Sequence, residues 1–113
     1  HCLWPSRHTR YHVGTSGNRT DVVEAFVRAC ERHGLMTGLY YCSWDNRHKL
    51  GSRTPSDLPW NSAFTTRAYQ DFQLGQIDEL LRGYGPVGQL WIDIPHVLPR
   101  DFRQALYEHA TSL

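Results

Sequence analysis

Asp93 is the carboxylate of this sequence that is best placed to take part in catalysis. Asp93 lies near the end of the apolar run Gln89-Leu90-Trp91-Ile92-Asp93-Ile94-Pro95, which predicts a buried strand. Side chains alternate along a strand, so Trp91 and Asp93 share one face, and Pro95 ends the strand. Asp93 is therefore expected at the carboxyl end, where parallel α/β proteins carry their active sites. The alternative from position alone is an aspartate that caps the next loop or helix.

Aromatic and polar side chains gather near the predicted strand ends: Trp4, Tyr40, Tyr41, Trp44, Asp45, His48, Trp91 and Asp93. Aromatic rings stack on the apolar C–H patches of a sugar, and carboxylates hydrogen-bond its hydroxyl groups, so this combination suits a carbohydrate site. Each residue alone has a simpler explanation. Strand tyrosines such as Tyr40 and Tyr41 more often belong to a core, and a loop histidine such as His48 is usually solvated.

The elements that must position these residues follow the order loop, helix, strand, long loop, helix, strand, helix. We expect helices over 21–33, from 65 or 66 to about 83, and from 99 or 100 to 111. Strands are expected over 35–42 and in the run that leads to Asp93. The remaining segments, 2–20 and 43–64, are expected to be loops, the second of them long and polar. Asp21 and Glu24 form a capping pattern, and Gly34 suits the end of the first helix. Gly75, inside the second helix, indicates close packing.

Two strands separated by a helix predict a parallel β-α-β unit, so the fold class is α/β. The chain has 113 residues, enough for one small domain, and two strands cannot close a sheet with helices on one side. Residues 1–113 therefore look like a slice of a larger (β/α) architecture. The opening His1-Cys2-Leu3-Trp4 also suggests a chain cut from a longer one. Such a slice exposes strand edges, and alone it is expected to be poorly soluble or oligomeric.

Composition bears on the partners, the membrane association and the cross-links to be expected of this chain. The net charge is +1 with mixed signs, which favours neither nucleic acid nor an anionic membrane. No apolar stretch approaches the ~18–20 residues of a membrane span. Three cysteines without C-x-x-C spacing argue against a disulfide framework.

Four groups of residues carry a family resemblance. They are Cys2-Leu3-Trp4-Pro5-Ser6-Arg7-His8-Thr9 with Asp21-Val22-Val23, Gly38-Leu39-Tyr40-Tyr41-Cys42-Ser43-Trp44-Asp45, Glu79-Leu80-Leu81 with Tyr84-Gly85-Pro86, and Leu90-Trp91-Ile92-Asp93. In order and spacing they resemble the α-L-fucosidases of glycoside hydrolase family 29. The resemblance implies a (β/α)8 TIM-like catalytic barrel, of which this chain is a partial slice. It also implies a retaining mechanism with no metal or other cofactor, acting on a fucosylated oligosaccharide or glycoconjugate. Family members are often exported or lysosomal, but the sequence leaves the compartment and the oligomeric state open.

The resemblance assigns roles residue by residue. Asp93 matches the family's nucleophile, and Trp91 matches a tryptophan that lines the fucose pocket. A tyrosine at the end of the first strand also reaches the sugar; Tyr41 is preferred because it is nearer the mouth, with Tyr40 as the alternative. The remaining matches, Trp44, Asp45 and His48, belong to the loop on the leaving-group side, where Trp44-Asp45-Asn46-Arg47 departs from the family's Trp-Asp-Arg-Asn.

Two further departures matter. The family carries a His-His-Asp-Gly-Phe run before the Cys-Leu-Trp segment, whereas only His1 precedes Cys2. The family's general acid/base comes from later in its chain, and Glu79 and Glu108 lie within predicted helices away from the mouth. This chain would thus hold the nucleophile without its partner, which leaves a non-catalytic carbohydrate-binding remnant as the alternative function.

A metal-dependent hydrolase is a third hypothesis. It would use His8, His12, His48 and Asp93. Their spacing matches no zinc pattern, because the pair four residues apart, His8 and His12, lies in a loop containing Pro and Gly rather than on a helix.

Overall fold

The computed structural model describes residues 2–45, 47–48 and 62–113. The elements are η1 (Val13–Thr15), α1 (Val22–Arg32), β1 (Gly38–Cys42), η2 (Ser62–Thr65), α2 (Arg67–Gly83), β2 (Gln89–Asp93), η3 (Pro95–Val97) and α3 (Arg100–Thr111). The predicted order is confirmed, although β1 begins three residues later than expected. Residues 46 and 49–61 of the predicted long loop lie outside the described residues. Within the described part, no helix combines the length and the apolar character needed to cross a membrane.

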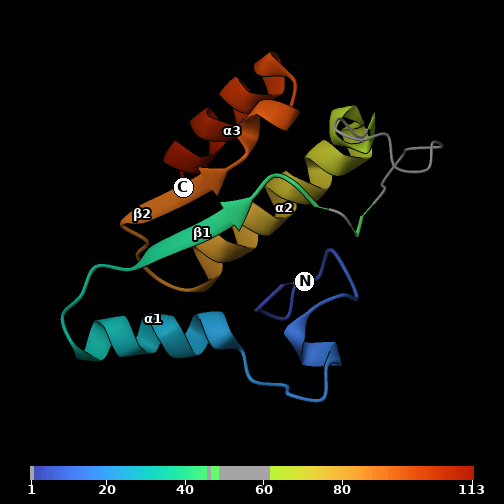
Figure 1. Ribbon diagram of the computed structural model, residues 1–113. Helices are drawn as coiled ribbons and strands as arrows, with labels where there is room; N and C mark the ends of the chain where they lie inside the picture. The colour runs from blue at the N-terminus through green and yellow to red at the C-terminus, as the bar shows by residue number, and fades with distance from the viewer. Residues whose placement is uncertain (1, 46, 49–61) are drawn as a thin grey trace.

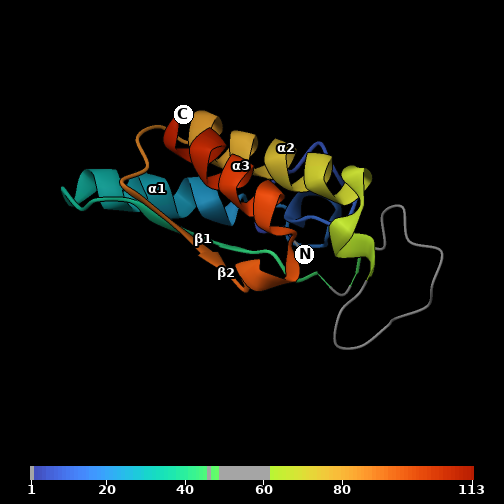
Figure 2. The ribbon, with the colours of Figure 1, turned by 90° about the horizontal axis from the view of Figure 1, so that it is seen from above.

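The two strands form a parallel sheet, as the β-α-β pattern predicted. Tyr40 of β1 pairs with Trp91 of β2, and Cys42 pairs with Asp93, so the carboxyl ends of both strands meet at one edge. α2 and α3 cover one face of this sheet and leave the other face open (Figures 1 and 2). The register therefore places the end of β1 directly beside the candidate carboxylate.

Local signals explain where the helices begin and end. The Asp21 carboxylate accepts a hydrogen bond from the backbone N–H of Glu24 at 3.0 Å, which caps α1 as predicted. Gly34 follows α1 with φ +63°, a left-handed conformation that glycine adopts without steric cost. Thr66 caps α2 by accepting from the backbone N–H of Tyr69.

The core lies between the covered face of the sheet and the helices. Its most buried large side chains are Tyr69, Phe64, Ile77, Leu80 and Leu106. Fully burying an aliphatic or aromatic side chain of this size stabilises the fold by about 1.5–3 kcal/mol. The predicted close approach at Gly75 is also present, because a Cβ atom there would collide with the imidazole ring of His8. Gly75 thus lets the N-terminal segment pack on α2.

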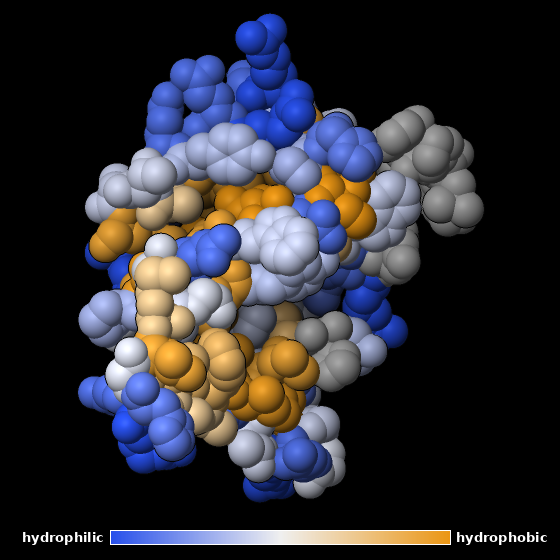
Figure 3. Space-filling model, turned by 60° about the vertical axis from the view of Figure 1, so that its left-hand side comes forward, coloured by the Kyte–Doolittle hydropathy of each residue, from blue (hydrophilic) through white to orange (hydrophobic). Residues whose placement is uncertain are grey.

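Each strand has one strand neighbour in the described part of the chain, so each has one unpaired edge. Large apolar side chains also reach the surface, among them Leu3, Phe26, Leu35, Met36 and Trp91. Figure 3 shows apolar residues exposed over part of one face, bordered by hydrophilic side chains. Both features favour association with other chains.

We therefore expect the isolated 113-residue chain to self-associate at micromolar concentration, because unpaired edges and exposed apolar area are both buried by association. Light scattering coupled to gel filtration measures the mass. Met36→Lys, which places a charge on a residue that is 71% exposed, should reduce the associated fraction. A monomer that unfolds cooperatively would contradict the prediction.

Candidate functional site

Asp93 lies at the carboxyl end of β2 and is held through both oxygen atoms. Its Oδ2 accepts a hydrogen bond from the Tyr40 hydroxyl at 2.7 Å, and its Oδ1 accepts from the backbone N–H of Ile94 at 2.9 Å. The Tyr40 ring meets Trp91 edge to face, with 5.7 Å between ring centroids. Tyr40 and Trp91 are 55% and 62% exposed, on the face of the sheet that the helices leave open. The structure thus brings one oriented carboxylate together with two accessible rings.

The hydrogen bond between Tyr40 and Asp93 also keeps the proton on the Tyr40 hydroxyl. Donation to the Asp93 carboxylate, together with contact with the Cys42 thiol, raises the pKa of the Tyr40 hydroxyl above its ordinary value of 10.0. Tyr40 therefore remains a neutral donor through neutral and mildly alkaline pH. A donor of this kind orients one carboxylate oxygen and leaves the face beside Trp91 open.

The backbone directly after Asp93 is strained. Ile94 has φ 49° and ψ 42°, the left-handed region, which is a genuine outlier for a β-branched residue. Such a conformation costs about 1–3 kcal/mol and is found preferentially at functional sites. The left-handed turn takes the chain out of β2 into η3 and lets the Ile94 N–H reach back to Asp93. The strain therefore helps to orient the carboxylate.

Tyr41 lies on the opposite face from Asp93. It is 7% exposed, and its hydroxyl donates to Oε1 of Gln76 on α2 at 3.0 Å. Burial raises the pKa of Tyr41 well above its ordinary value. Nearness to the strand end favours Tyr41 as the tyrosine of the site, but alternation along β1 places Tyr40, and not Tyr41, on the face of Trp91 and Asp93. The strand register shows the same placement, because Tyr40 pairs with Trp91.

The loop residues predicted for the leaving-group side follow β1. Trp44 packs on Phe64 with 5.3 Å between ring centroids. Asp45 accepts a hydrogen bond from His48, Oδ2 to Nδ1, at 2.6 Å. All three loop residues line a groove of about 710 Å³ along β1, together with Tyr40 and Tyr41. Trp91 and Asp93 are not among the residues that line this groove.

Sequence reasoning missed several residues that shape this region. Cys42 pairs with Asp93 in the register and shares the face of Tyr40. The guanidinium group of Arg47 lies over the Tyr11 ring, 4.8 Å from its centroid. Thr9 bonds to His48. Strand parity could have found Cys42, whereas the contacts of Thr9 and Tyr11 link segments too distant in sequence for any local signal.

Polar side chains of α2 anchor the end of β1. The carbonyl oxygen of Ser43 accepts hydrogen bonds from the Tyr69 hydroxyl and from Nε2 of Gln73, both at 3.0 Å. The backbone N–H of Ser43 donates to the Asp93 carbonyl at 3.0 Å, which extends the pairing of β1 with β2. Gln73 is fully buried, so these bonds are made away from water. They hold the chain that leaves β1 at the level of Asp93.

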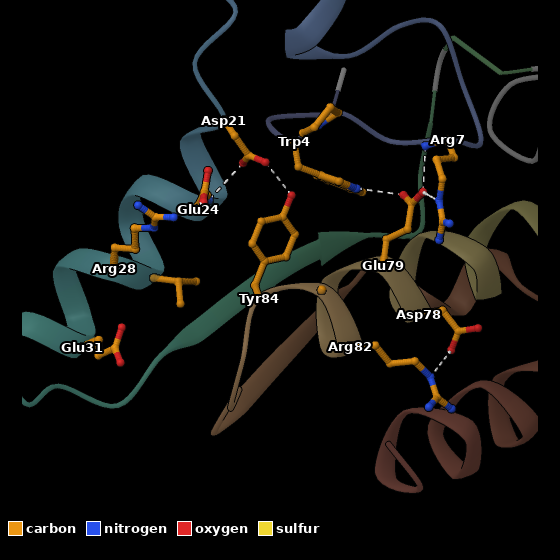
Figure 4. A pocket seen from close by; sticks show the side chains of 13 residues that line it. Trp4, Arg7, Asp21, Glu24, Arg28, Glu31, Asp78, Glu79, Arg82 and Tyr84 are labelled. Atoms are coloured by element: carbon orange, nitrogen blue, oxygen red, sulfur yellow. Dashed lines mark hydrogen bonds and ion pairs between the residues drawn. The ribbon is translucent and has the colours of Figure 1, made fainter.

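A second cleft, of about 790 Å³, lies between the N-terminal segment, α1 and α2. Figure 4 shows Trp4 and Arg7 directed at Glu79, and Tyr84 directed at Asp21. Glu79 Oε2 accepts from the indole N–H of Trp4 at 2.9 Å, and Oε1 accepts from the backbone N–H of Arg7 at 2.7 Å. Both carboxylate oxygens of Glu79 thus hold the N-terminal segment on α2.

These contacts make Glu79 important for stability. Burial alone would raise its pKa, but the hydrogen bonds from Arg7 and Trp4 outweigh burial and hold the pKa below its ordinary 4.5. A carboxyl group with a lowered folded-state pKa stabilises the fold above the unfolded pKa, and this contribution is lost as the pH falls through the folded value.

Glu79→Gln should therefore lower the free energy of unfolding by about 1–3 kcal/mol at pH 7 and by much less at pH 3. Thermal denaturation of the full-length protein at both pH values measures this. Glu31→Gln, at an exposed position lining the same cleft, is the matched control. Equal effects of the two substitutions at pH 7 would contradict the role given to Glu79.

The residues of the metal hypothesis do not come together as a ligand set. In the described ranges, no group of three or more His, Cys, Asp or Glu side chains could hold a metal ion. His12 accepts a hydrogen bond from the backbone N–H of Gly14, and His48 is bonded to Thr9 and Asp45. The chemistry that this arrangement supports is that of an oriented carboxylate beside aromatic rings.

Comparisons with known proteins agree on one family. The model of the α-L-fucosidase family matches residues 1–111. Putative α-L-fucosidase 1 of Oryza sativa subsp. japonica is 36% identical over 95 residues, and α-L-fucosidase 1 of Arabidopsis thaliana is 34% identical over 95 residues. Each match covers 81% of this chain but only 16% of the relative, so the chain spans a small part of these curated relatives.

Solved structures share the fold. A family 29 α-L-fucosidase from Bacteroides thetaiotaomicron superposes with a TM-score of 0.76 at 23% identity, over 98% of this chain and 25% of that one. The Lactobacillus casei α-L-fucosidase AlfC, in complex with α-L-fucose, superposes with a TM-score of 0.74 at 23% identity. This match covers 97% of this chain and 39% of the AlfC chain. The predicted fold class, an α/β slice of a TIM-like barrel with parallel strands, is confirmed. With the family match over almost its whole length, the chain belongs to the α-L-fucosidase family.

Proposed function

We propose that residues 1–113 are a segment of the catalytic barrel of an α-L-fucosidase that removes terminal α-L-fucosyl groups from glycans with retention of configuration. One observation carries this proposal. In a chain of the α-L-fucosidase family, Asp93 is oriented at the carboxyl end of β2 by Tyr40 and lies on the open face that carries Trp91. A strand-end carboxylate beside exposed rings suits a nucleophile in a sugar site.

The chemistry needs two carboxyl groups about 5–5.5 Å apart. An oxygen of Asp93 attacks C1 of fucose, and the bond from C1 to the leaving oxygen breaks as a second carboxyl group protonates that oxygen. This gives a fucosyl ester of Asp93, which water cleaves after the second group takes one of its protons. In this proposal the second group comes from outside residues 1–113. A Bacteroides thetaiotaomicron family 29 enzyme trapped as a covalent intermediate with 2-fluoro-fucosyl fluoride supports this course.

The other residues take roles from their positions. Trp91 supplies the ring against which the apolar side of fucose packs, and Tyr40 orients the nucleophile. Trp44 lies on the leaving-group side, after β1. Tyr41 belongs to the packing of β1 on α2. The substrate is a fucosylated oligosaccharide or glycoconjugate, a class that Lactobacillus casei AlfC represents through its complex with Fuca(1,6)GlcNAc.

Covalent labelling tests the proposal directly. A 2-deoxy-2-fluoro-fucosyl fluoride loses fluoride as its C1 forms an ester with the nucleophile, and the 2-fluorine slows hydrolysis of that ester. In the full-length protein, mass spectrometry should find one fucosyl adduct, on the peptide that carries Asp93, and none in Asp93→Ala. An adduct on another carboxylate would overturn the assignment.

A carbohydrate-binding remnant without catalysis is the second candidate. It is favoured by the exposure of Tyr40 and Trp91, which would bind a sugar whether or not an acid/base group is present. Calorimetry with L-fucose separates the two candidates. Binding that Trp91→Ala abolishes, with no hydrolysis and no covalent adduct, would favour the remnant.

A further inference from the structure

Three side chains form a continuous hydrogen-bonded chain beside the candidate site. Nδ1 of His48 lies 2.6 Å from Oδ2 of Asp45, and Nε2 of His48 lies 2.7 Å from Oγ1 of Thr9. The side chains of His48 and Asp45 are only 15% and 26% exposed. The three residues are called the Thr9–His48–Asp45 relay below.

The partners fix where the protons of the relay lie. An ionised Asp45 can only accept, so Nδ1 of His48 carries the proton between them. In neutral imidazole Nε2 is then an acceptor, and the hydroxyl of Thr9 donates to it. Thr9 Oγ1 also accepts from the backbone N–H of Tyr11 at 3.0 Å, and Asp45 Oδ1 accepts from the backbone N–H groups of Arg47 and His48. Each group therefore has a defined role as donor or acceptor.

The relay joins three parts of the molecule that are distant in sequence. Thr9 belongs to the N-terminal segment, and Asp45 and His48 follow β1. The His48 ring packs on Phe72 of α2, with 4.7 Å between ring centroids. The segment that leaves β1 next to Asp93 is thus held from two sides. Arg47 over the Tyr11 ring adds a second contact between the same two segments.

The same bonds change what Asp45 and His48 can do. Both oxygens of Asp45 and both ring nitrogens of His48 are occupied by protein partners. Three of the about four acceptor sites of the Asp45 carboxylate are used in this way, so these side chains are committed mainly to the protein. We therefore expect Asp45 and His48 to affect a substrate by positioning the segment that carries Trp44. Trp44, which directly precedes Asp45, lines the groove along β1.

We infer that the Thr9–His48–Asp45 relay is a positioning device that fixes the segment carrying Trp44 and so determines which leaving groups the fucosyl site accepts. This inference rests on the proposed function and deepens it. In the proposed function fucose lies at Asp93 and Trp44 lies on the leaving-group side, so the relay would act on the next position along the glycan. Loosening the relay should therefore affect substrates with a sugar leaving group more than substrates with a small activated one.

The relay itself is tested without activity. In the full-length protein, ¹⁵N NMR of histidine-labelled samples, with His48 assigned through His48→Gln, should show Nδ1 protonated and Nε2 as an acceptor. Thr9→Val, which removes the hydroxyl but keeps the shape, should shift Nε2 and leave Nδ1 nearly unchanged, whereas Thr9→Ser should restore the wild-type shift. The opposite tautomer, or an Nε2 unaffected by Thr9→Val, would overturn the relay.

Its role is tested by comparing two substrates. For Thr9→Val we expect kcat/KM on the fucosyl disaccharide that the wild-type protein hydrolyses best to fall about tenfold, the scale of one lost hydrogen bond, mainly through KM. The loss on a 4-nitrophenyl α-L-fucoside should be several-fold smaller, and Thr9→Ser should recover both. Thr111→Val, on α3, is the control.

Equal losses on both substrates, in step with a lowered Tm, would mean a merely structural role and overturn the inference while the proposed function stands. No hydrolysis of either substrate by the wild-type protein, with no adduct at Asp93, would refute the proposed function and this inference with it. An intact relay seen by NMR would then remain a property of the fold alone.

Discussion

Asp93→Ala is expected to lower kcat/KM on an activated aryl α-L-fucoside by about 10³-fold or more, because the substitution removes the carboxylate that we propose forms the covalent bond to C1. Steady-state hydrolysis by the full-length protein measures the loss. Removing the side chain leaves a space beside Tyr40 and Trp91, and azide can enter it as an external nucleophile. Azide should therefore restore part of the rate and yield a fucosyl azide of inverted configuration relative to the substrate.

Asp101→Ala is the matched control, because Asp101 is an exposed aspartate in the first turn of α3. It should retain nearly full activity. If Asp93→Ala also retained activity, Asp93 would be a residue that only shapes the turn at Ile94. The nucleophile would then have to be another carboxylate, whereas no hydrolysis by either protein would favour the sugar-binding remnant.

Tyr40→Phe is expected to lower kcat about 10- to 100-fold, because the carboxylate of Asp93 loses the donor that orients Oδ2. The ring remains, so contact with Trp91 and substrate binding should change little, and KM should stay within a few-fold of the wild-type value. The pH dependence adds a second readout. Since the pKa of the Tyr40 hydroxyl is raised, Tyr40 keeps its proton and should not produce the alkaline limb of the profile.

Tyr41→Phe provides the comparison for Tyr40→Phe. Tyr41 donates to Gln76 on the covered face, so losing its hydroxyl should lower Tm while kcat changes little. The two neighbouring tyrosines thus separate an effect on the site from an effect on packing. Loss of activity in Tyr41→Phe, with activity kept in Tyr40→Phe, would contradict the roles given to the two tyrosines.

The sequence allowed the order of elements to be predicted because local signals mark them. The cap formed by Asp21, the glycine after α1 and the Pro after β2 are all read within a few residues. The position of Asp93 at a strand end followed from the same logic. The start of β1 was wrong by three residues because no punctuation separates Leu35 from Gly38.

The site was harder to predict because it depends on register and on distant contacts. The choice between Tyr40 and Tyr41 needed the pairing of β1 with β2, which no single strand reveals. The relay through Thr9 needed the N-terminal segment to meet the loop after β1, across 39 residues. The left-handed conformation of Ile94 was also hidden, since β-branched residues normally avoid it.

The contacts of the N-terminal segment with α2 have a consequence for synthesis on the ribosome. The indole of Trp4 bonds to Glu79, 75 residues further along the chain, and Gln76 donates to the Cys2 thiol across 74 residues. At about 5–20 residues per second, the ribosome needs roughly 4–15 s to deliver these partners. During that interval the indole of Trp4 and the thiol of Cys2 have been translated but lack their partners on α2. The indole of Trp4 is therefore ordered against α2 only after Glu79 has been made, and chaperones have seconds in which to bind it.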